Sequence, residues 1–473
     1  MSMSEALTKA LPLLYALEQR GYETVFVGGC VRDTLLGKPL KDVDIATAAS
    51  PEQVIATFPH TVPTGLQHGT VTVVHEKETY EITTFRTESA YEQYRRPTQV
   101  QFVTSLNEDL LRRDFTINSM AMRYDETIID PFHGQDDLRS GLLRCVGDAD
   151  ARLQEDALRI VRAVRFAAAY ELRIAHMTWR AIIRHRGLLA HIAMERVGLE
   201  LDKMIAGSRP YRAASLLASS GMLAYTKDRL PAAILEAAAG YKKSSKRDTS
   251  SGATVSPEAQ SERMTLVAQS MRRLHRLEDN EDRWAAVCAA LSMQIVQASE
   301  LFALLRYSSS RTARLAAILG VHGAMAPRLH QNMNIAPGHP DGEGEIVQAE
   351  SELQDHWRLT VLKYGMSAAE SWLGIVVAIP ELVYGAAAAN QRLASIEDEW
   401  NRLRQTLHSM AVRSIRELAV KGKDLLSLTG KPSGPWLGQL LQSLVEAAAL
   451  GRVPNEKGPL LDEAAAVLNK DEN

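Results

Sequence analysis

The stretch "GGCVRDTLLGKPLKDVDIAT", Gly28–Thr47, combines adjacent glycines, an arginine and two aspartates that stand one residue apart. The preceding "ETVFV" is typical of a buried strand, so Gly28 and Gly29 are predicted to form a turn between that strand and a short helix. Backbone can approach a phosphate closely where no Cβ intervenes, and a helix N-terminus favours anions. Arg32 would add a charge-assisted contact. The stretch therefore predicts a phosphate-binding turn; a structural turn with Arg32 paired to an acid is the alternative.

Asp42 and Asp44 are the second signal in this stretch. "DVDIAT" is predicted to be a strand, on which residues two apart share a face with Cα atoms roughly 6.5–7 Å apart. Two carboxylates placed in this way suit Mg²⁺, which prefers oxygen ligands together with substrate phosphates. Paired ions can activate an attacking hydroxyl and stabilise a leaving pyrophosphate. A bare pair of this kind is more often a solvated strand edge or a turn, so the functional interpretation depends on the neighbouring glycines.

The composition is typical of a soluble globular chain: 473 residues, 45% hydrophobic and 23% charged, with a net charge of -3. A protein that is basic throughout is excluded, but a local basic face is not. The 3 cysteines, Cys30, Cys145 and Cys288, form no CxxC pair, which argues against a disulfide framework and fits a reducing cytoplasm. No signal peptide is recognisable, and the longest apolar run, "WLGIVVAI", is too short to span a bilayer. A cytoplasmic protein without a membrane segment is expected.

Two regions with different patterns divide the chain. Up to about residue 145, an amphipathic helix over 5–20, the two strands and an alternating hairpin pattern over 69–85 predict a mixed α/β head. From Asp150 onward the sequence is rich in Ala, Leu, Arg and Glu, which favours helices. The segment 241–263 is polar and rich in Ser, Lys and Thr, so a flexible linker or exposed insertion is predicted there.

A second cluster lies in "LLRRDFTINSMAM", Leu110–Met122. Arg113 could bind a phosphate, while Asp114 and Asn118 could hydrogen-bond a ribose hydroxyl. The equally weighted alternative is an N-capping aspartate beside surface arginines. The histidines of the chain show no HExxH spacing and no His-Asp dipeptide, so they do not indicate a metal site.

The third cluster, "EDALRIVRAVRF" (Glu155–Phe166), repeats a charged residue every three positions: Asp156, Arg159, Arg162 and Arg165. On one helix these residues would form a slowly drifting stripe. An aspartate only accepts hydrogen bonds and an arginine only donates them. Such a pair matches the exocyclic amine and ring nitrogen of cytosine or adenine, whereas uracil and guanine present a mismatched edge. The alternative is a set of surface ion pairs, each worth a few tenths of a kcal/mol.

Together these motifs resemble the class II tRNA nucleotidyltransferase family, which comprises CCA-adding enzymes and bacterial poly(A) polymerases. "GGCVRD" with "DVD" is similar to the family's catalytic motif, with Cys30 where alanine is commoner. "RRDFTINSMA" resembles its ribose-selecting motif and "EDALRIVRAVRF" its base-reading motif. "DPFHGQDDL" and "ERVGLELDKMI" resemble the motifs of the hinge and of the neck. The resemblance covers roughly residues 20–210 in order, weakens through the body and returns in the "GKDLLSLTGKPSGPWLG" tail.

The resemblance implies an α+β chain: a polymerase-β-like nucleotidyltransferase head followed by an all-helical neck, body and tail that hold tRNA. The expected bounds are 1–148 for the catalytic head, 149–210 for the neck, 211–400 for the body with its insertion at about 241–263, and 401–473 for the tail. The resemblance assigns Asp42 and Asp44 to catalysis and to Mg²⁺. It assigns the binding of incoming ATP or CTP to Gly29, Arg32, Arg113, Asp156, Arg159, Arg162 and Arg165. Glu81 is the candidate for a third active-site carboxylate.

The activity implied is template-independent addition, and repair, of the terminal CCA of tRNA from CTP and ATP, with release of pyrophosphate. "PTGLQHGTVTVV" resembles CCA-adding members, whereas poly(A) polymerases are typically more basic there. "RTESAYEQYRRP" (86–97) corresponds to the flexible loop that A addition requires and that CC-only enzymes shorten, so its presence favours a full CCA enzyme or one that adds only the terminal A. An A-only enzyme or a poly(A) polymerase is the alternative within the family. A silent RNA-binding protein is the rival outside it, and the intact aspartate pair argues against silence. The oligomeric state is left open, with a homodimer as one option.

Overall fold

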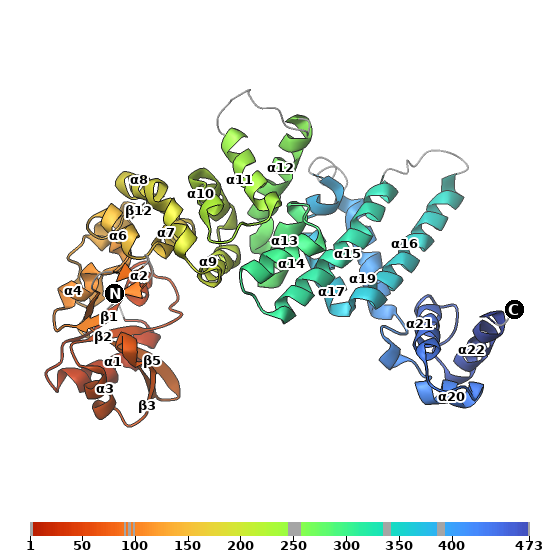
Figure 1. The fold of residues 1–473 in the computed structure, drawn as a ribbon, viewed down its shortest axis with the longest axis horizontal. Helices are drawn as coiled ribbons and strands as arrows, with labels where there is room; N and C mark the ends of the chain where they lie inside the picture. The colour runs from red at the N-terminus through yellow and green to blue at the C-terminus, as the bar shows by residue number, and fades with distance from the viewer. Residues whose placement is uncertain are drawn as a thin grey trace. The chain divides into compact units, whose positions relative to one another are not determined.

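The computed structural model describes residues 3–88, 91–92, 96–97, 100–244, 257–333, 342–385 and 393–471 (Figure 1). The chain forms two compact units, Met1–Met204 with Arg212–Leu230, and Ile205–Tyr211 with Pro231–Asn473. Figure 1 shows the sheet in the first unit, drawn in red and orange, whereas the labelled elements of the second unit are helices. The predicted α+β class, with strands in the head and helices after it, is confirmed.

A sheet of seven described strands lies at the centre of the head, in the order β11-β10-β1-β2-β5-β4-β3. Its strands are β1 (Thr24–Val27), β2 (Asp44–Thr47), β3 (Thr61–Gly65), β4 (Thr70–His75), β5 (Glu78–Thr84), β10 (Ala121–Met122) and β11 (Ile128–Ile129). Strands β2 and β5 pair in parallel, and the other neighbours are antiparallel. The predicted hairpin is confirmed: its turn residues Glu76 and Lys77 have φ values of 50° and 68°, as a two-residue hairpin turn requires.

The alternation of side chains along β1 explains why the sheet is covered on both faces. Phe26 belongs to the core that includes Leu14 of α1 (Glu5–Glu18), whereas Val25 and Val27 belong to the opposite core, with Leu110 of α4 (Leu106–Leu111). All four residues of β1 are buried. The central strands are therefore held from both sides, and the residues that follow their ends have a fixed support.

The rest of the first unit consists of short helices and strand pairs. The further helices from this part of the chain are α2 (Gly29–Leu35), α3 (Pro51–Thr57), α5 (Gly134–Arg139), α6 (Ala149–Glu155), α7 (Leu158–Ala169), α8 (His176–His185), α9 (Met194–Ala206) and α10 (Pro210–Ser220). The strand pairs are β12 (Leu142–Leu143) with β13 (Arg173–Ile174), β6 (Arg86–Glu88) with β9 (Val100–Phe102), and β7 (Tyr91–Glu92) with β8 (Arg96–Pro97). The predicted loop at 86–97 thus includes β6, β7 and β8, and its residues 89–90 and 93–95 lie outside the described residues.

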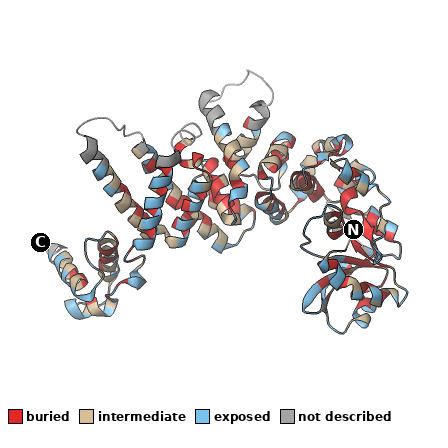
Figure 2. Cartoon of the chain, turned by 180° about the vertical axis from the view of Figure 1, so that it is seen from behind, coloured by how far each residue is buried: buried red, intermediate tan, exposed pale blue. Residues whose placement is uncertain are grey.

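The second unit is built from helices whose buried sides face one another (Figure 2). They are α11 (Ala232–Ser244), α12 (Pro257–Arg273), α13 (Asn280–Ala290), α14 (Ile295–Leu304), α15 (Ser309–Met333), α16 (Gly342–Tyr364), α17 (Met366–Ala378), α19 (Leu393–Ser409), α20 (Gly422–Thr429), α21 (Pro435–Ala449) and α22 (Lys457–Asp471). Trp357 of α16 and Trp372 of α17 are buried with their ring centroids 5.6 Å apart. Burial of such large rings accounts for much of the driving force that joins these helices.

Helices extend into both ends of the segment 241–263, for which a flexible linker or exposed insertion was predicted. Helix α11 continues to Ser244 and α12 begins at Pro257, so 241–244 and 257–263 are helical. A proline is favoured in the first turn of a helix, where its missing N–H costs nothing. Residues 245–256 lie outside the described residues.

The end of the chain has a small core of its own. Leu425 of α20, Leu444 of α21 and Leu460 of α22 are buried together. Gly430, with a φ of 61° in the left-handed region, ends α20. In the part of the chain that the structure describes, no helix is long and apolar enough to cross a membrane.

Candidate active site

The turn after β1 brings together three segments that are distant in the sequence. Gly28 has a φ of +73°, in the left-handed region that favours glycine. A Cβ at this position would lie 2.9 Å from Nη1 of Arg113 and 4.0 Å from Oδ2 of Asp44. A side chain here would therefore displace Arg113. The glycine is needed both for its backbone conformation and for this close approach.

The predicted carboxylates gather beside this turn, with one correction. Strand β2 begins at Asp44, so Asp42 lies two residues before the strand rather than on it. The pairing of β2 with β1 ends near this point because the turn at Gly28 follows Val27, the last residue of β1. The described pairing of β2 with β5 starts at Asp44 and Glu81. Registered residues of neighbouring parallel strands are about 4.8 Å apart and face the same side. Glu81 therefore lies next to Asp44.

The charge around Asp44 fits a cation site. Although the residue keeps access to solvent, partial loss of hydration raises the pKa of its carboxyl, and the charges of Glu81 and Asp42 raise it further against the opposing effect of Arg113 and Arg32. Carboxylate oxygens are the ligands that Mg²⁺ prefers, usually together with water and substrate phosphates. Among the described residues, no group of three or more acidic, histidine or cysteine side chains is arranged to hold a metal by itself.

Arg32 is buried and surrounded by partners. Its exposed fraction is 5%. It donates hydrogen bonds to both carboxylate oxygens of Asp33, each at 3.0 Å. It also donates to Oδ1 of Asn118 and to the hydroxyl of Tyr170. Nη2 lies 3.6 Å from the place of a Cβ at Gly29, so the guanidinium folds back toward the glycine turn. The structure thus places the predicted Arg32 beside this turn, together with Asn118 and the unpredicted Tyr170.

Arg113 depends on an acid that the motif analysis missed. Asp109, 1% exposed, accepts hydrogen bonds from Arg112 Nη2 at 2.7 Å and from Arg113 Nη2 at 3.1 Å. Burial alone would raise the pKa of Asp109, but Arg113 and Arg112 hold it below its usual value. The three-residue and four-residue spacings are those of neighbours on a helix surface. That spacing was a signal for Asp109 in the sequence.

Asp114 forms the most strongly stabilised charge of the site. It is 7% exposed and accepts from Nη2 of Arg162 at 2.7 Å, from Nδ2 of Asn118 at 2.9 Å and from the backbone N–H of Phe115 at 2.8 Å. Burial opposes ionisation, yet Arg162 and Asn118 lower the pKa of Asp114 to about 2. The predicted ribose-reading residues are therefore joined to the third cluster by one buried ion pair.

Glu200 of α9 is a second unpredicted acid. It is 3% exposed, pairs with Arg165 and lies 4.0 Å from Nη1 of Arg162. The rings and guanidinium groups also stack: Cζ of Arg165 is 4.0 Å and Cζ of Arg162 is 5.2 Å from the ring centroid of Phe166. Glu200 offsets the positive charge that α7 concentrates at this place.

The predicted stripe on a single helix is wrong for its first member. Helix α6 ends at Glu155 and α7 begins at Leu158, so Asp156 lies in the break between them. Its side chain accepts a hydrogen bond from the N–H of Leu158 at 3.0 Å, which is the capping behaviour that makes aspartate interrupt helices. Its other partner is Arg196 of α9, at 2.7 Å.

Arg159, predicted to work beside Asp156, has different partners. It donates to Glu155 at 2.7 Å and to the backbone carbonyls of Arg152 at 3.0 Å and Arg112 at 2.8 Å. The bond to Arg112 links α7 to the second cluster. The structure therefore joins the second and third clusters through Arg159 as well as through Arg162, while Asp156 and Arg159 each engage other groups.

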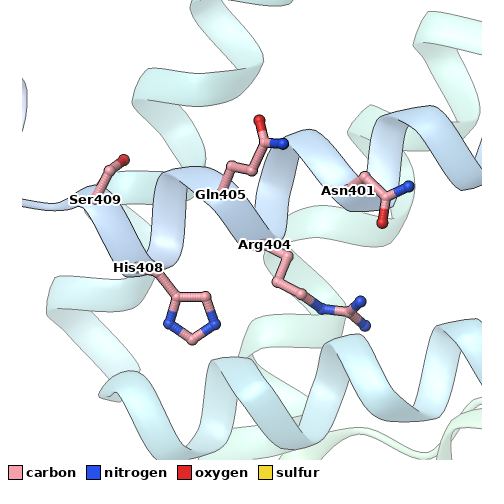
Figure 3. A pocket seen from close by; sticks show the side chains of 5 residues that line it. All are labelled: Asn401, Arg404, Gln405, His408 and Ser409. Carbon is pink, nitrogen blue, oxygen red and sulfur yellow. The ribbon is translucent and has the colours of Figure 1, made fainter.

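A shallow hollow of about 670 Å³ lies on α19 in the second unit (Figure 3). It is lined by Asn401, Arg404, Gln405, His408 and Ser409. No carboxylate lines it, and Figure 3 shows Arg404 and His408 pointing to the same side of the helix. This surface offers hydrogen-bond donors and a positive charge.

A mixed sheet that presents carboxylates beside an arginine-lined glycine turn defines a nucleotidyltransferase. Family models match in three places: the poly A polymerase head domain at residues 24–144, a probable RNA and SrmB-binding site of polymerase A at 171–230, and a putative tRNA nucleotidyltransferase domain 2 at 376–464. The CCA-adding enzyme of Geobacillus stearothermophilus is 37% identical over 456 residues, 96% of either chain. That of Lactiplantibacillus plantarum is 34% identical over 460 residues, covering 97% of this chain and 96% of its own.

A solved structure agrees with these relatives. The crystal structure of the Bacillus stearothermophilus CCA-adding enzyme in complex with CTP superposes with a TM-score of 0.76 at 34% identity, over 99% of both chains. The chain belongs to the family of CCA-adding enzymes. This confirms the resemblance drawn from the motifs.

Proposed function

We propose that the protein adds CMP, CMP and AMP from CTP and ATP to the 3′ end of tRNA and repairs incomplete ends. The observation that supports this best is the close approach of Gly28, Asp44 and Arg113, with Glu81 in register beside Asp44. It brings a glycine turn, the positive charge of Arg113 and two carboxylates to one place. The full-length similarity to CCA-adding enzymes makes tRNA the acceptor.

The transfer itself is an in-line displacement. The tRNA 3′-hydroxyl attacks the α-phosphorus and releases its proton to solvent, the bond from the α-phosphorus to the bridging oxygen breaks, and pyrophosphate leaves with the electron pair. Asp42 and Asp44, with Glu81, would hold Mg²⁺, which would lower the pKa of the hydroxyl and stabilise the leaving group. Arg32 and Arg113 bind the triphosphate and, with Gly28 and Gly29, orient it toward the carboxylates.

Selection of the base follows from hydrogen-bond complementarity. Asp156 accepts and Arg159 donates, which suits the amine and ring nitrogen of cytosine and adenine. Asp156 pairs with Arg196, and Arg159 pairs with Glu155. A base that is read by Asp156 and Arg159 would compete with these partners. In this proposal Asp114 and Asn118 hydrogen-bond the ribose hydroxyls. Arg162 and Arg165, which pair with Asp114 and Glu200, would bind phosphates.

The remaining helices provide the tRNA surface in this proposal. In this proposal the head comprises residues 1–148, the neck 149–210, the body 211–400 and the tail 401–473. The protein works in the cytoplasm. Arginines of the helical part, such as Arg404 in its carboxylate-free hollow, bind backbone phosphates. The affinity for tRNA then falls with salt. A homodimer stays a prediction, which light scattering tests.

One incorporation assay tests the function. Purified protein and Mg²⁺ are incubated with tRNA that ends at the discriminator base, at C or at CC, and with each labelled nucleotide in turn. Addition of C, C and A supports the proposal. Activity on the CC-ended tRNA alone identifies an A-only enzyme, and long A tails identify a poly(A) polymerase. No incorporation on any substrate contradicts the enzymatic interpretation.

A further inference from the structure

Tyr170 occupies a position that the motifs of the chain did not single out. It follows the last residue of α7 and is half-buried. Its hydroxyl accepts a hydrogen bond from Nη2 of Arg32, which is 138 residues away in the sequence. The Arg32 guanidinium carbon is 4.2 Å from the centroid of the same ring. One side chain thus holds Arg32 both through its polar group and through its ring.

The same ring carries a second cation. Nζ of Lys38 is 4.5 Å from the centroid of Tyr170. Lys38 and Arg32 come from the segment that connects the glycine turn to Asp42 and Asp44, so the ring gathers two of the three positive charges of this segment, Lys41 being the third. A cation over a tyrosine face is attracted by the ring quadrupole, which offsets the repulsion between two neighbouring cations.

The bonds of Arg32 leave it able to bind an anion. Asp33, Asn118 and Tyr170 accept from four of its five N–H groups, which leaves one N–H on Nη1 without a partner in the described part of the chain. Without the ring, Arg32 would lose its contacts with Tyr170 and keep Asp33, Asn118 and the more distant ring of Phe166, whose centroid is 5.4 Å from its guanidinium carbon. Burial raises the pKa of Tyr170 to about 12, with Arg32 opposing the shift and Asp33 adding to it, so the hydroxyl stays neutral at pH 7.

We propose that Tyr170 is a positioning residue for the triphosphate of the incoming nucleotide, acting by holding Arg32 beside the Gly28–Gly29 turn and Lys38 at the same ring. The inference rests on the proposed function. Because CTP and ATP share the triphosphate and differ in the base, loss of Tyr170 weakens both nucleotides to the same extent. Base choice, which involves Asp156 and Arg159, is unaffected.

The test compares variants by their nucleotide KM and kcat on tRNA. Tyr170→Ala raises the KM for CTP and for ATP by the same factor, about 5- to 30-fold, with kcat within about twofold of wild type. Tyr170→Phe keeps the ring and raises both KM values only about threefold, since one hydrogen bond is lost. The control is Tyr225→Ala, which removes another tyrosine in contact with an arginine, the Arg186 guanidinium carbon being 4.8 Å from its ring. Its nucleotide KM values stay at those of wild type.

A probe without a base separates positioning of the phosphates from recognition of the base. Tripolyphosphate competes with the nucleotide, and its Ki rises in Tyr170→Ala by the same factor as the KM values. Lys38→Met is a substitution at an exposed position, and it raises the KM values when Tyr170 is intact. In the Tyr170→Phe or Tyr170→Ala background the same substitution raises them by a smaller factor, because Lys38 acts through the tyrosine ring. If Tyr170→Ala does not fold, the double-mutant cycle of Lys38→Met with Tyr170→Phe still tests the proposal.

Unequal shifts for CTP and ATP, a fall in kcat at unchanged KM, or an unchanged Ki for tripolyphosphate each overturn the inference. If the wild-type protein incorporates nucleotides and the Tyr170 variants match it, the inference alone fails. If the wild-type protein incorporates nothing on any tRNA, the proposed function fails first. Calorimetric titration with tripolyphosphate then still reports whether Tyr170 supports an anion site.

Discussion

Asp44 and Glu81 occupy registered positions on the neighbouring parallel strands β2 and β5. Their side chains face the same side of the sheet at the spacing of adjacent strands. Glu81 contributes to the raised pKa of Asp44, after loss of hydration and against Arg113. The pair therefore places a third acidic group at the site where Asp42 and Asp44 were predicted to act.

Replacement of Glu81 by Gln tests whether this third carboxylate takes part in the reaction. We expect turnover on tRNA to fall at least about tenfold at saturating Mg²⁺, because an oxygen ligand loses its charge. Turnover equal to that of wild type would remove Glu81 from the site. The matched control is Glu78→Gln on the same strand, where the acid pairs with Lys9 at the surface. That change should leave the rate unaltered.

Replacement of Asp42 or Asp44 by Asn should have a much larger effect. Either substitution removes a predicted metal ligand, so we expect the rate of CMP and AMP transfer to fall by about 10³ or more. Single-turnover incorporation of labelled nucleotide measures this. Asp125→Asn, an exposed turn residue of the head, is the control. Activity that survives in both Asp42→Asn and Asp44→Asn would refute the metal assignment.

The identity of the added base should depend on the third cluster. With Asp156→Ala and Arg159→Ala combined, we expect discrimination against UTP and GTP to weaken by about tenfold or more, since a hydrogen-bonding site rejects a mismatched edge through its unpaired polar groups. The measured quantity is kcat/KM for each of the four nucleotides. Asp150→Ala with Arg184→Ala removes a partly exposed aspartate–arginine pair of the same unit and serves as the control. Unchanged selectivity in the first double variant contradicts the base-edge argument.

The buried pair of Asp114 and Arg162 should make the stability of the head pH-dependent. The pKa of Asp114 is about 2 in the folded protein, against 3.8 for the free group. A lowered pKa stabilises the fold above pH 4, and this contribution of about 2 kcal/mol is lost as the pH falls from about 4 toward 2.

Asp114→Asn should therefore lower the protection against hydrogen exchange of peptides around residues 110–120 at pH 7. The difference from wild type should shrink in acid, as measured by the extent of exchange after brief acid pulses at pH 5, 4, 3 and 2. A difference that stays constant over this range would show that Asp114 is not ionised in the folded protein. Asp136→Asn, at an exposed ion pair with Arg139, is the control.

Much of the candidate site was predictable because its signals are local. The turn at Gly28, the aspartate pair and the hairpin depend on residues a few positions apart, whose spacing and conformational preferences can be read directly. The same kind of reasoning failed where a local preference competed with the predicted period: Asp156 caps the start of α7 instead of continuing a helix. Asp109 was missed although its spacing from Arg112 and Arg113 was visible.

The amino-acid sequence by itself determined the strand and helix segments around the glycine turn, the class of chemistry and the family. Only the tertiary structure decided that Glu81 is registered with Asp44, that Arg159 reaches the backbone of Arg112, and that Tyr170 holds Arg32. Each of these contacts joins segments that are far apart in the chain. They arise from strand register and from the packing of α7 against the head, and neither is encoded in the spacing of neighbouring residues.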